Sequence, residues 1–93
     1  MLEKHLERKF VDEVKRRGGI CPKWVAPGFD GVPDRIVILP GRHIGFVEIK
    51  APGKKLRKLQ EARFRLLEKL GFAPHVLDGE EKIGVIIDDI QDS

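Results

Sequence analysis

Apolar residues recur at helical spacing at the start of the chain and again in its second half. Leu6, Phe10 and Val14 lie four residues apart, which predicts a helix over residues 2–17 that buries one face. The glycine pair at residues 18–19 is typical of a helix end. A second helix is expected over 56–70, with a buried stripe made of Leu59, Ala62, Leu66 and Leu70.

Two runs rich in β-branched residues, separated by a short turn, predict a β-hairpin in the middle of the chain. The first run covers residues 35–39 and the second covers 43–50, with a Pro-Gly-Arg segment at 40–42 between them. If those three residues form the loop, counting back along both strands sets Asp34 opposite Glu48. This register is one of several that the pattern allows.

Three further segments are expected to be regular. Residues 20–25 form a strand candidate, which Pro22 confines to a sheet edge because proline donates no backbone hydrogen bond. Residues 73–77 predict another strand. Isoleucines at helical spacing predict a short terminal helix over 83–90, although the run 85–87 also suits a strand. The predicted order is helix, three strands, helix, strand and terminal helix, an α/β (α+β) arrangement.

The composition indicates one globular domain over residues 1–93. The chain is 41% hydrophobic and 35% charged, which is typical of a folded protein and not of a disordered one. No apolar run approaches the roughly 20 residues of a membrane span, and no signal peptide is evident. The single cysteine, Cys21, excludes an internal disulfide and a cysteine-based zinc site. We therefore expect no membrane association and a cytoplasmic location, in a bacterial or phage-infected cell.

The hairpin carries the candidate chemistry. Residues two apart in a strand share a face, so Glu48 and Lys50 point the same way while Ile49 points into the core. In the register above, Asp34 joins them. Two carboxylates this close repel each other unless a cation lies between them. Their oxygen atoms are ligands that Mg²⁺ and Mn²⁺ prefer.

The net charge of +3 is modest, but its distribution is uneven. Lys54, Lys55, Arg57 and Lys58 cluster where the second helix is expected to begin. The helix dipole disfavours cations at that end, whereas free backbone amides together with cations bind phosphate well. The alternative is an ordinary solvated face. We favour contact with a nucleic-acid backbone.

Three strings of residues resemble the VRR-Nuc (virus-type replication-repair nuclease) branch of the PD-(D/E)xK restriction-endonuclease-like superfamily. They are Gly31-Val32-Pro33-Asp34-Arg35-Ile36, then Phe46-Val47-Glu48-Ile49-Lys50-Ala51-Pro52-Gly53, then Leu59-Gln60. The similarity extends from the first helix to the last predicted strand. It implies a restriction-endonuclease-like core and DNA cleavage with Mg²⁺ or Mn²⁺ and without an organic cofactor.

The resemblance also implies roles for individual residues. Asp34, Glu48 and the backbone carbonyl of Ile49 would hold the metal, and Lys50 would position or deprotonate the attacking water. Gln60 would orient water or phosphate beside Lys50.

An acid of the first helix also belongs to the metal site in this family. Glu7 lies inside the apolar arc of that helix, and Glu3 is the weaker candidate. The alternative for Glu7 is solvent contact or an ion pair with an arginine. Lys23 and Arg63 are expected to contact DNA beside the basic cluster.

Small members of the family suggest a homodimer that cuts branched DNA, four-way (Holliday) junctions above all. A two-fold symmetric protein would match a two-fold symmetric substrate. Two alternatives remain open at this point. One is a flap or nicking nuclease, and the other is a non-catalytic basic subunit that binds DNA.

Overall fold

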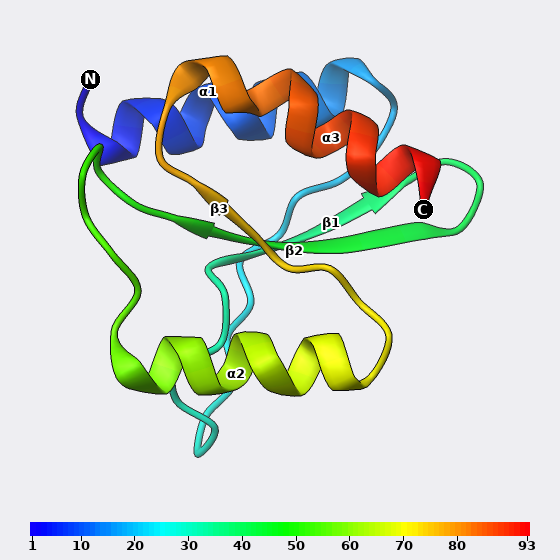
Figure 1. Cartoon of the computed structure of the whole chain (residues 1–93). Helices are drawn as coiled ribbons and strands as arrows, with labels where there is room; N and C mark the ends of the chain where they lie inside the picture. Colours follow the sequence, from blue (N-terminus) through cyan, green and yellow to red (C-terminus); the bar gives the residue numbers. More distant parts are fainter.

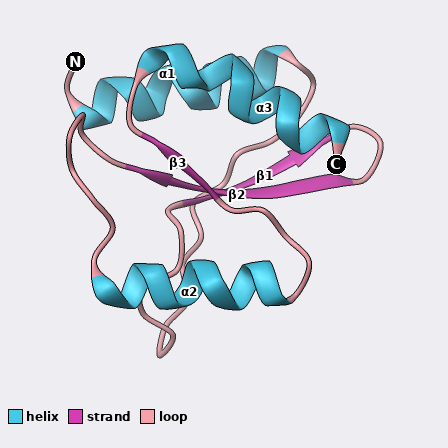
Figure 2. Cartoon of the chain, viewed as in Figure 1, coloured by secondary structure: helices cyan, strands magenta, loops and turns pink.

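The computed structural model describes residues 1–93, which form three layers. Helices α1 (Glu3–Arg16) and α3 (Ile83–Asp92) lie side by side on one face of a sheet, and α2 (Lys58–Lys69) lies on the opposite face (Figure 1). The sheet between them contains β1 (Arg35–Leu39), β2 (His43–Ile49) and β3 (His75–Leu77), in that order (Figure 2). The predicted α+β fold is confirmed.

The hairpin has the predicted register. Strands β1 and β2 are antiparallel, and Leu39 faces His43 across the three-residue loop. Strand β3 then pairs in parallel with the far end of β2, where Glu48 faces Val76. At this end of β2, Val47 has strand partners on both sides, Arg35 of β1 and His75 of β3, whereas Glu48 and Ile49 pair with β3. This end of the sheet carries the Glu-Ile-Lys sequence.

The predicted strand over residues 20–25 is present only as two isolated bridges. Ile20 pairs with Ile38 and Lys23 pairs with Arg35, both antiparallel along the free edge of β1. Pro22 lies between the two bridges and has no N–H to donate, although its carbonyl accepts a 3.0 Å hydrogen bond from the backbone of Ile36. The segment therefore follows the edge of the sheet without becoming a continuous strand.

The main core lies between the sheet and the layer formed by α1 and α3. Alternate residues of both hairpin strands point into it, as the period of two requires. The strands contribute Val37, Leu39, Val47 and Ile49, and the apolar faces of the two helices contribute Leu6, Phe10, Val14, Ile83, Ile86, Ile87 and Ile90. Gly45 allows α3 to approach, because a Cβ atom there would lie 2.4 Å from the Cδ1 atom of Ile90. The predicted terminal helix is confirmed, and a 3₁₀ turn over Glu80–Lys82 precedes it.

Helix α2 faces the sheet with a different side from the one predicted. Gln60 and Leu67 are its buried residues, whereas Leu59, Leu66 and Leu70 of the predicted stripe are exposed. The helix covers only part of the sheet. Beyond it, the side chains of Ile20, Ile38 and Ile44 remain exposed on the same face.

None of the helices has the length and apolar character needed to cross a bilayer.

Candidate active site

Asp34 and Glu48 come together at the end of the hairpin, as the register predicts. Asp34 precedes β1 directly, after the buried Pro33. Its Oδ2 atom accepts a 2.9 Å hydrogen bond from the backbone N–H of Ile49. The bond joins the chain just before β1 to the last residue of β2, so the position of Asp34 depends on hairpin pairing.

Glu48 is the most buried acid of the chain, with 2% of its surface exposed. One carboxylate oxygen, Oε2, accepts a 2.9 Å hydrogen bond from Nε2 of Gln60 and lies 3.3 Å from Nζ of Lys50. The other oxygen, Oε1, is buried and has no hydrogen-bond partner among the protein atoms. A buried carboxylate oxygen without a donor is costly. The arrangement of Glu48 therefore favours a cation as its further partner.

Burial raises the pKa of both carboxyl groups above the usual range. For Asp34 the negative charges of Glu7 and Glu3 add to the effect, while the hydrogen bond from Ile49 opposes it. For Glu48 the charge of Asp34 adds to the effect of burial, and Lys50 opposes it. Raised carboxyl pKa values mean that each acid is stabilised by anything that supplies positive charge beside it.

The residues present fit a divalent cation such as Mg²⁺ or Mn²⁺. No three His, Cys, Asp or Glu side chains converge on one point. However, Mg²⁺ is commonly bound through one or two carboxylates, with water and substrate phosphate completing its octahedral shell. Asp34 and Glu48 supply two such carboxylates, and one of their oxygens is buried without a partner. The donors are all oxygen, which suits these hard ions.

Glu7 lies beside this site and is paired with an arginine. Its Oε2 atom accepts a 2.8 Å hydrogen bond from Nε of Arg35, whose Nη1 atom donates to the backbone carbonyl of Cys21 at 2.8 Å. The ion-pair alternative considered for Glu7 is therefore the arrangement that the structure contains. Glu7 nevertheless lines a cavity of about 240 Å³ together with Glu3, Lys23 and Asp34.

Sequence reasoning missed Arg35 as the partner of Glu7, although a signal was present. Arg35 alternates with Val37 and Leu39, so it points toward the same core face of β1. Glu7 likewise lies within the apolar arc of its helix. Two opposite charges, each at a core-facing position, are each other's natural partners.

Gln60 lies in the site but is already engaged. Its Oε1 atom accepts a 2.9 Å hydrogen bond from the backbone N–H of Arg57 at the start of α2, while its Nε2 atom donates to Glu48. The side chain is 5% exposed. It therefore holds Glu48 in one orientation and caps the helix at the same time.

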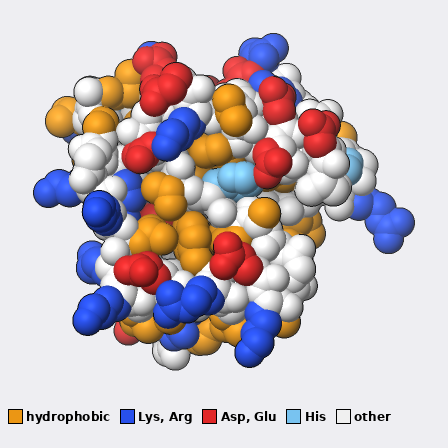
Figure 3. All heavy atoms as spheres, viewed as in Figure 1, with side chains coloured by type: hydrophobic (Ala, Val, Ile, Leu, Met, Phe, Trp, Pro, Cys, Tyr) orange, Lys and Arg blue, Asp and Glu red, His pale blue; other side chains and the backbone are white.

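The predicted DNA-contacting residues form two groups. Lys54, Lys55, Arg57 and Lys58 are all exposed before and at the beginning of α2, and Lys23 is exposed at the rim of the cavity. Figure 3 shows Lys and Arg side chains gathered over the lower part of the molecule, where α2 lies. Arg63 is different, because its Nε atom donates a 2.7 Å bond to the carbonyl of Asp30 and its guanidinium lies over the ring of Phe29.

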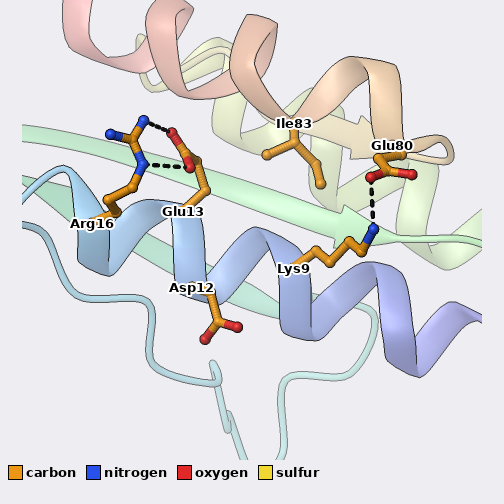
Figure 4. A pocket seen from close by; sticks show the side chains of 6 residues that line it. All are labelled: Lys9, Asp12, Glu13, Arg16, Glu80 and Ile83. Atoms are coloured by element: carbon orange, nitrogen blue, oxygen red, sulfur yellow. Dashed lines mark hydrogen bonds and ion pairs between the residues drawn. The ribbon is translucent and has the colours of Figure 1, made fainter.

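A second polar hollow, between α1 and the 3₁₀ turn, is not a comparable site. Lys9 pairs with Glu80 at 2.7 Å, and Arg16 pairs with Glu13 (Figure 4). These charges neutralise one another at an exposed surface. The pair of Lys9 and Glu80 links α1 to the 3₁₀ turn, the pair of Arg16 and Glu13 lies within α1, and none of these side chains has a buried polar atom without a partner.

The histidines lie outside the candidate site. His75 pairs with Asp89 at 3.0 Å, and burial lowers its pKa. His43 lies 3.1 Å from the backbone carbonyl of Ser93, so both rings connect the sheet with the end of α3.

Comparison with known proteins identifies the family of this fold and site. No protein-family model matches the chain. It is 43% identical over 84 residues to the protein named "Putative nuclease p44" from Acyrthosiphon pisum secondary endosymbiont phage 1, covering 90% of each chain. A solved structure described as "VRR_NUC domain" matches with a TM-score of 0.87 and 26% identity, over 92% of this chain and 94% of that one. The chain therefore belongs to the VRR-Nuc family of PD-(D/E)xK nucleases.

Proposed function

We propose that the protein is a metal-dependent, structure-specific endonuclease that hydrolyses phosphodiester bonds in branched DNA, with four-way junctions as its main substrate. The observation that carries this proposal is the pairing of the half-buried carboxylate of Asp34 with the buried carboxylate of Glu48, one of whose oxygens, Oε1, has no hydrogen-bond partner. Beside them lies the ammonium group of Lys50. This is a site for a cation and a phosphate.

Asp34, Glu48 and the backbone carbonyl of Ile49 are the groups that would hold Mg²⁺ or Mn²⁺. When bound, the ion would reduce the charge on the scissile phosphate and make an attacking water more acidic. Gln60 keeps the carboxylate of Glu48 fixed in orientation through its 2.9 Å hydrogen bond. No organic cofactor is needed for this reaction.

Lys50 has two roles in the proposed reaction. It shares a strand face with Glu48, and its Nζ atom is 3.3 Å from that carboxylate. From there it positions the attacking water by hydrogen bonding. It also stabilises the negative charge that develops on the phosphate oxygens.

Glu7 contributes through the cavity that it shares with Asp34. Arg35 occupies one of its oxygen atoms, Oε2. The remaining oxygen is available to orient water at the site. In this proposal Glu7 supports the pair formed by Asp34 and Glu48 and is not one of its principal metal ligands.

DNA binding is assigned to the exposed cations at the beginning of α2 and at the cavity rim. Helix α2 starts at Lys58, directly after Lys54, Lys55 and Arg57, so free amides and cations lie together. Lys23 lines the cavity that also contains Asp34. Arg63 acts in this proposal through the loop that it holds.

The test is a cleavage assay on four-way-junction, 5′-flap and linear duplex DNA of matched sequence, each with Mg²⁺, Mn²⁺ or EDTA. We expect paired, symmetric cuts in the junction that disappear with EDTA. Cutting of the flap without cutting of the junction would show that the protein is the flap or nicking nuclease and not a junction nuclease. No metal-dependent cutting of any substrate would favour the non-catalytic DNA-binding subunit.

A homodimer is part of the proposal, and the exposed part of the sheet supports it. Ile20, Ile38 and Ile44 lie in a row across three neighbouring segments, 57%, 37% and 44% exposed. Apolar side chains grouped on a sheet face that α2 leaves uncovered are typical of an interface. A two-fold axis pairs the same patch from both copies. Because the three side chains are uncharged, the two patches can pack together without electrostatic repulsion.

Replacing Ile44 by Lys is therefore expected to yield monomers. In the dimer, two ammonium groups would face each other across the proposed two-fold interface and repel. In the monomer, the lysine side chain remains accessible to solvent, so the fold is not disturbed. Light scattering coupled to size-exclusion chromatography measures the mass. Val85→Lys is the matched control, because Val85 is 67% exposed on α3, on the opposite face of the sheet. A dimeric Ile44→Lys protein would show that this face is not the interface.

A further inference from the structure

The segment between Lys23 and Arg35 forms a loop whose two ends are joined beside the site. The backbone N–H of Trp24 donates a 2.9 Å hydrogen bond to the carbonyl of Asp34. Residues 25–33 therefore form a loop whose two ends lie next to each other. We call these nine residues the site loop. It projects past α2 and forms the lower extremity of the molecule (Figure 1). Its position is thus fixed relative to the catalytic aspartate.

The site loop is held at several points. Nε of Arg63 donates a 2.7 Å hydrogen bond to the carbonyl of Asp30, and the Arg63 guanidinium lies 3.9 Å from the centre of the Phe29 ring. Gly31 has a φ of +88°, and a Cβ atom there would lie 2.7 Å from a side-chain carbon of Leu59. A glycine therefore permits the loop to rest directly on α2. These contacts give the loop a defined shape.

The side chains that this fixed loop presents to solvent are mainly apolar. Val25 is 77% exposed, more than any other large hydrophobic residue of the chain, and Phe29 is 38% exposed. Pro27, between them, is also exposed. Presenting such side chains on a firmly held loop costs hydration free energy, which contact with a partner would recover.

The charges of the loop indicate which part of DNA it suits. The chain has 18 lysines and arginines, yet none occurs from residue 24 to 34. Asp30 adds a negative charge to the loop. A surface for the phosphate backbone needs cations, so the site loop is poorly suited to that role. Apolar side chains suit the faces of unpaired bases, which stack on aromatic and apolar groups.

The loop also reaches the site itself. Val25 and Val32 line the cavity of about 240 Å³ that contains the carboxylates of Asp34 and Glu7. A base contacted by Val25 would therefore belong to a nucleotide close to the scissile phosphate. Lys23, at the same rim, is available for the adjoining phosphate.

We propose that the site loop contacts an unpaired or unstacked base at the branch point of the DNA, through the exposed side chains of Val25 and Phe29. This inference rests on the proposed function, because it assigns substrate selection to the same site. Paired duplex bases are buried in the stack, so only a branched or otherwise opened substrate offers its base faces to the loop. The loop thereby provides selectivity for branched DNA, while the cations around α2 provide affinity.

The experiment measures binding to a four-way junction that contains 2-aminopurine at the branch point, in EDTA so that no cleavage occurs. Wild-type protein is expected to raise the fluorescence of this base, because unstacking relieves its quenching. Val25→Ser and Phe29→Ala are each expected to remove the increase and weaken junction binding about tenfold. Binding to linear duplex stays unchanged. Val85→Ser, which alters a comparably exposed valine on α3, is the control and should behave as wild type.

Val25 is too exposed for the Ser variant to threaten folding, so its result decides the proposal even if Phe29→Ala loosens the loop. Unchanged fluorescence with wild-type protein, or wild-type behaviour of Val25→Ser, would overturn the proposal. A change from dimer to monomer in Val25→Ser would also overturn it, because the loop would then contact a second copy. None of these readouts requires cleavage. Failure of the loop proposal can therefore be distinguished from failure of the proposed nuclease activity.

Discussion

Asp34→Asn and Lys50→Ala are each expected to reduce junction cleavage by about a thousandfold or more, while DNA affinity stays within a few-fold of wild type. Asn retains the shape of Asp34 but removes the negative charge that attracts a cation. Ala removes the ammonium group that lies 3.3 Å from Glu48. The exposed cations around α2 are unaltered, so binding to DNA persists. Single-turnover cleavage rates and fluorescence-anisotropy titrations measure the two effects separately.

Asp12→Asn is the matched control for the loss of an acid. Asp12 is exposed on α1, away from the hairpin, and lines the second polar hollow. The Asp12→Asn variant should cleave the junction as the wild-type protein does. Substantial cleavage by Asp34→Asn and Lys50→Ala would contradict the assignment of the site. Equal, low activity of wild-type protein and both variants would instead favour the non-catalytic DNA-binding subunit.

A large increase in thermal stability is expected when Mn²⁺ or Mg²⁺ is added to the metal-free protein. An ion that binds the folded chain at a hundredfold excess over its Kd adds about 2.7 kcal/mol to the free energy of unfolding. In a domain of this size, that corresponds to an increase in Tm on the order of 10 °C. Glu48→Gln and Asp34→Asn should lose the increase, and Asp12→Asn should keep it. Equal increases in all four proteins, measured by differential scanning fluorimetry, would place the bound ions elsewhere.

The increase in Tm on metal binding should depend on pH, and the direction of this dependence follows from the raised pKa values of Asp34 and Glu48. Without metal, the folded chain binds protons at these two groups more tightly than the unfolded chain does. Their contribution to stability is therefore greatest at low pH and is lost as pH rises through the raised pKa values. Metal binding needs the deprotonated forms. The metal-induced increase in Tm should accordingly be smaller at acidic pH, where the two carboxyl groups are protonated, and larger at pH values above their raised pKa values.

The pairing of Asp34 with Glu48 was predictable because two local rules determine it. A three-residue loop sets the register of the hairpin, and the period of two sets the faces of its strands. Together they bring Asp34 opposite Glu48 and leave Lys50 beside it, as the structure has them. Neither rule needs information from distant parts of the chain.

The orientation of α2 was not predictable in this way. Its apolar residues lie on more than one side of the helix: Leu59, Leu66 and Leu70 on one side, and Phe64 and Leu67 on another. Helical periodicity alone favours the larger group. In the structure, Gln60 turns the helix the other way, because its amide is buried against Glu48. A polar contact between distant elements has thus overridden the hydrophobic pattern.

The segment over residues 20–25 and the partner of Glu7 also depended on tertiary contacts. Pro22 correctly indicated an edge, but only the structure shows that pairing is limited to Ile20 and Lys23. The pairing of Glu7 with Arg35 joins residues 28 positions apart. Such a contact follows from the fold and cannot be derived from either local pattern alone.

The two hydrogen bonds of Gln60 have a practical consequence for engineering. The amide caps the backbone of α2 at Arg57 and also fixes the carboxylate of Glu48. Helix α2 therefore cannot be exchanged for another helix as an independent unit, since the graft would remove a support of the Glu48 carboxylate. A chimaera designed to alter DNA affinity must retain glutamine at the third position of the helix. With Gln60 kept, and with Leu59 and Arg63 kept for their contacts with the site loop, the other exposed residues of α2 are open to redesign.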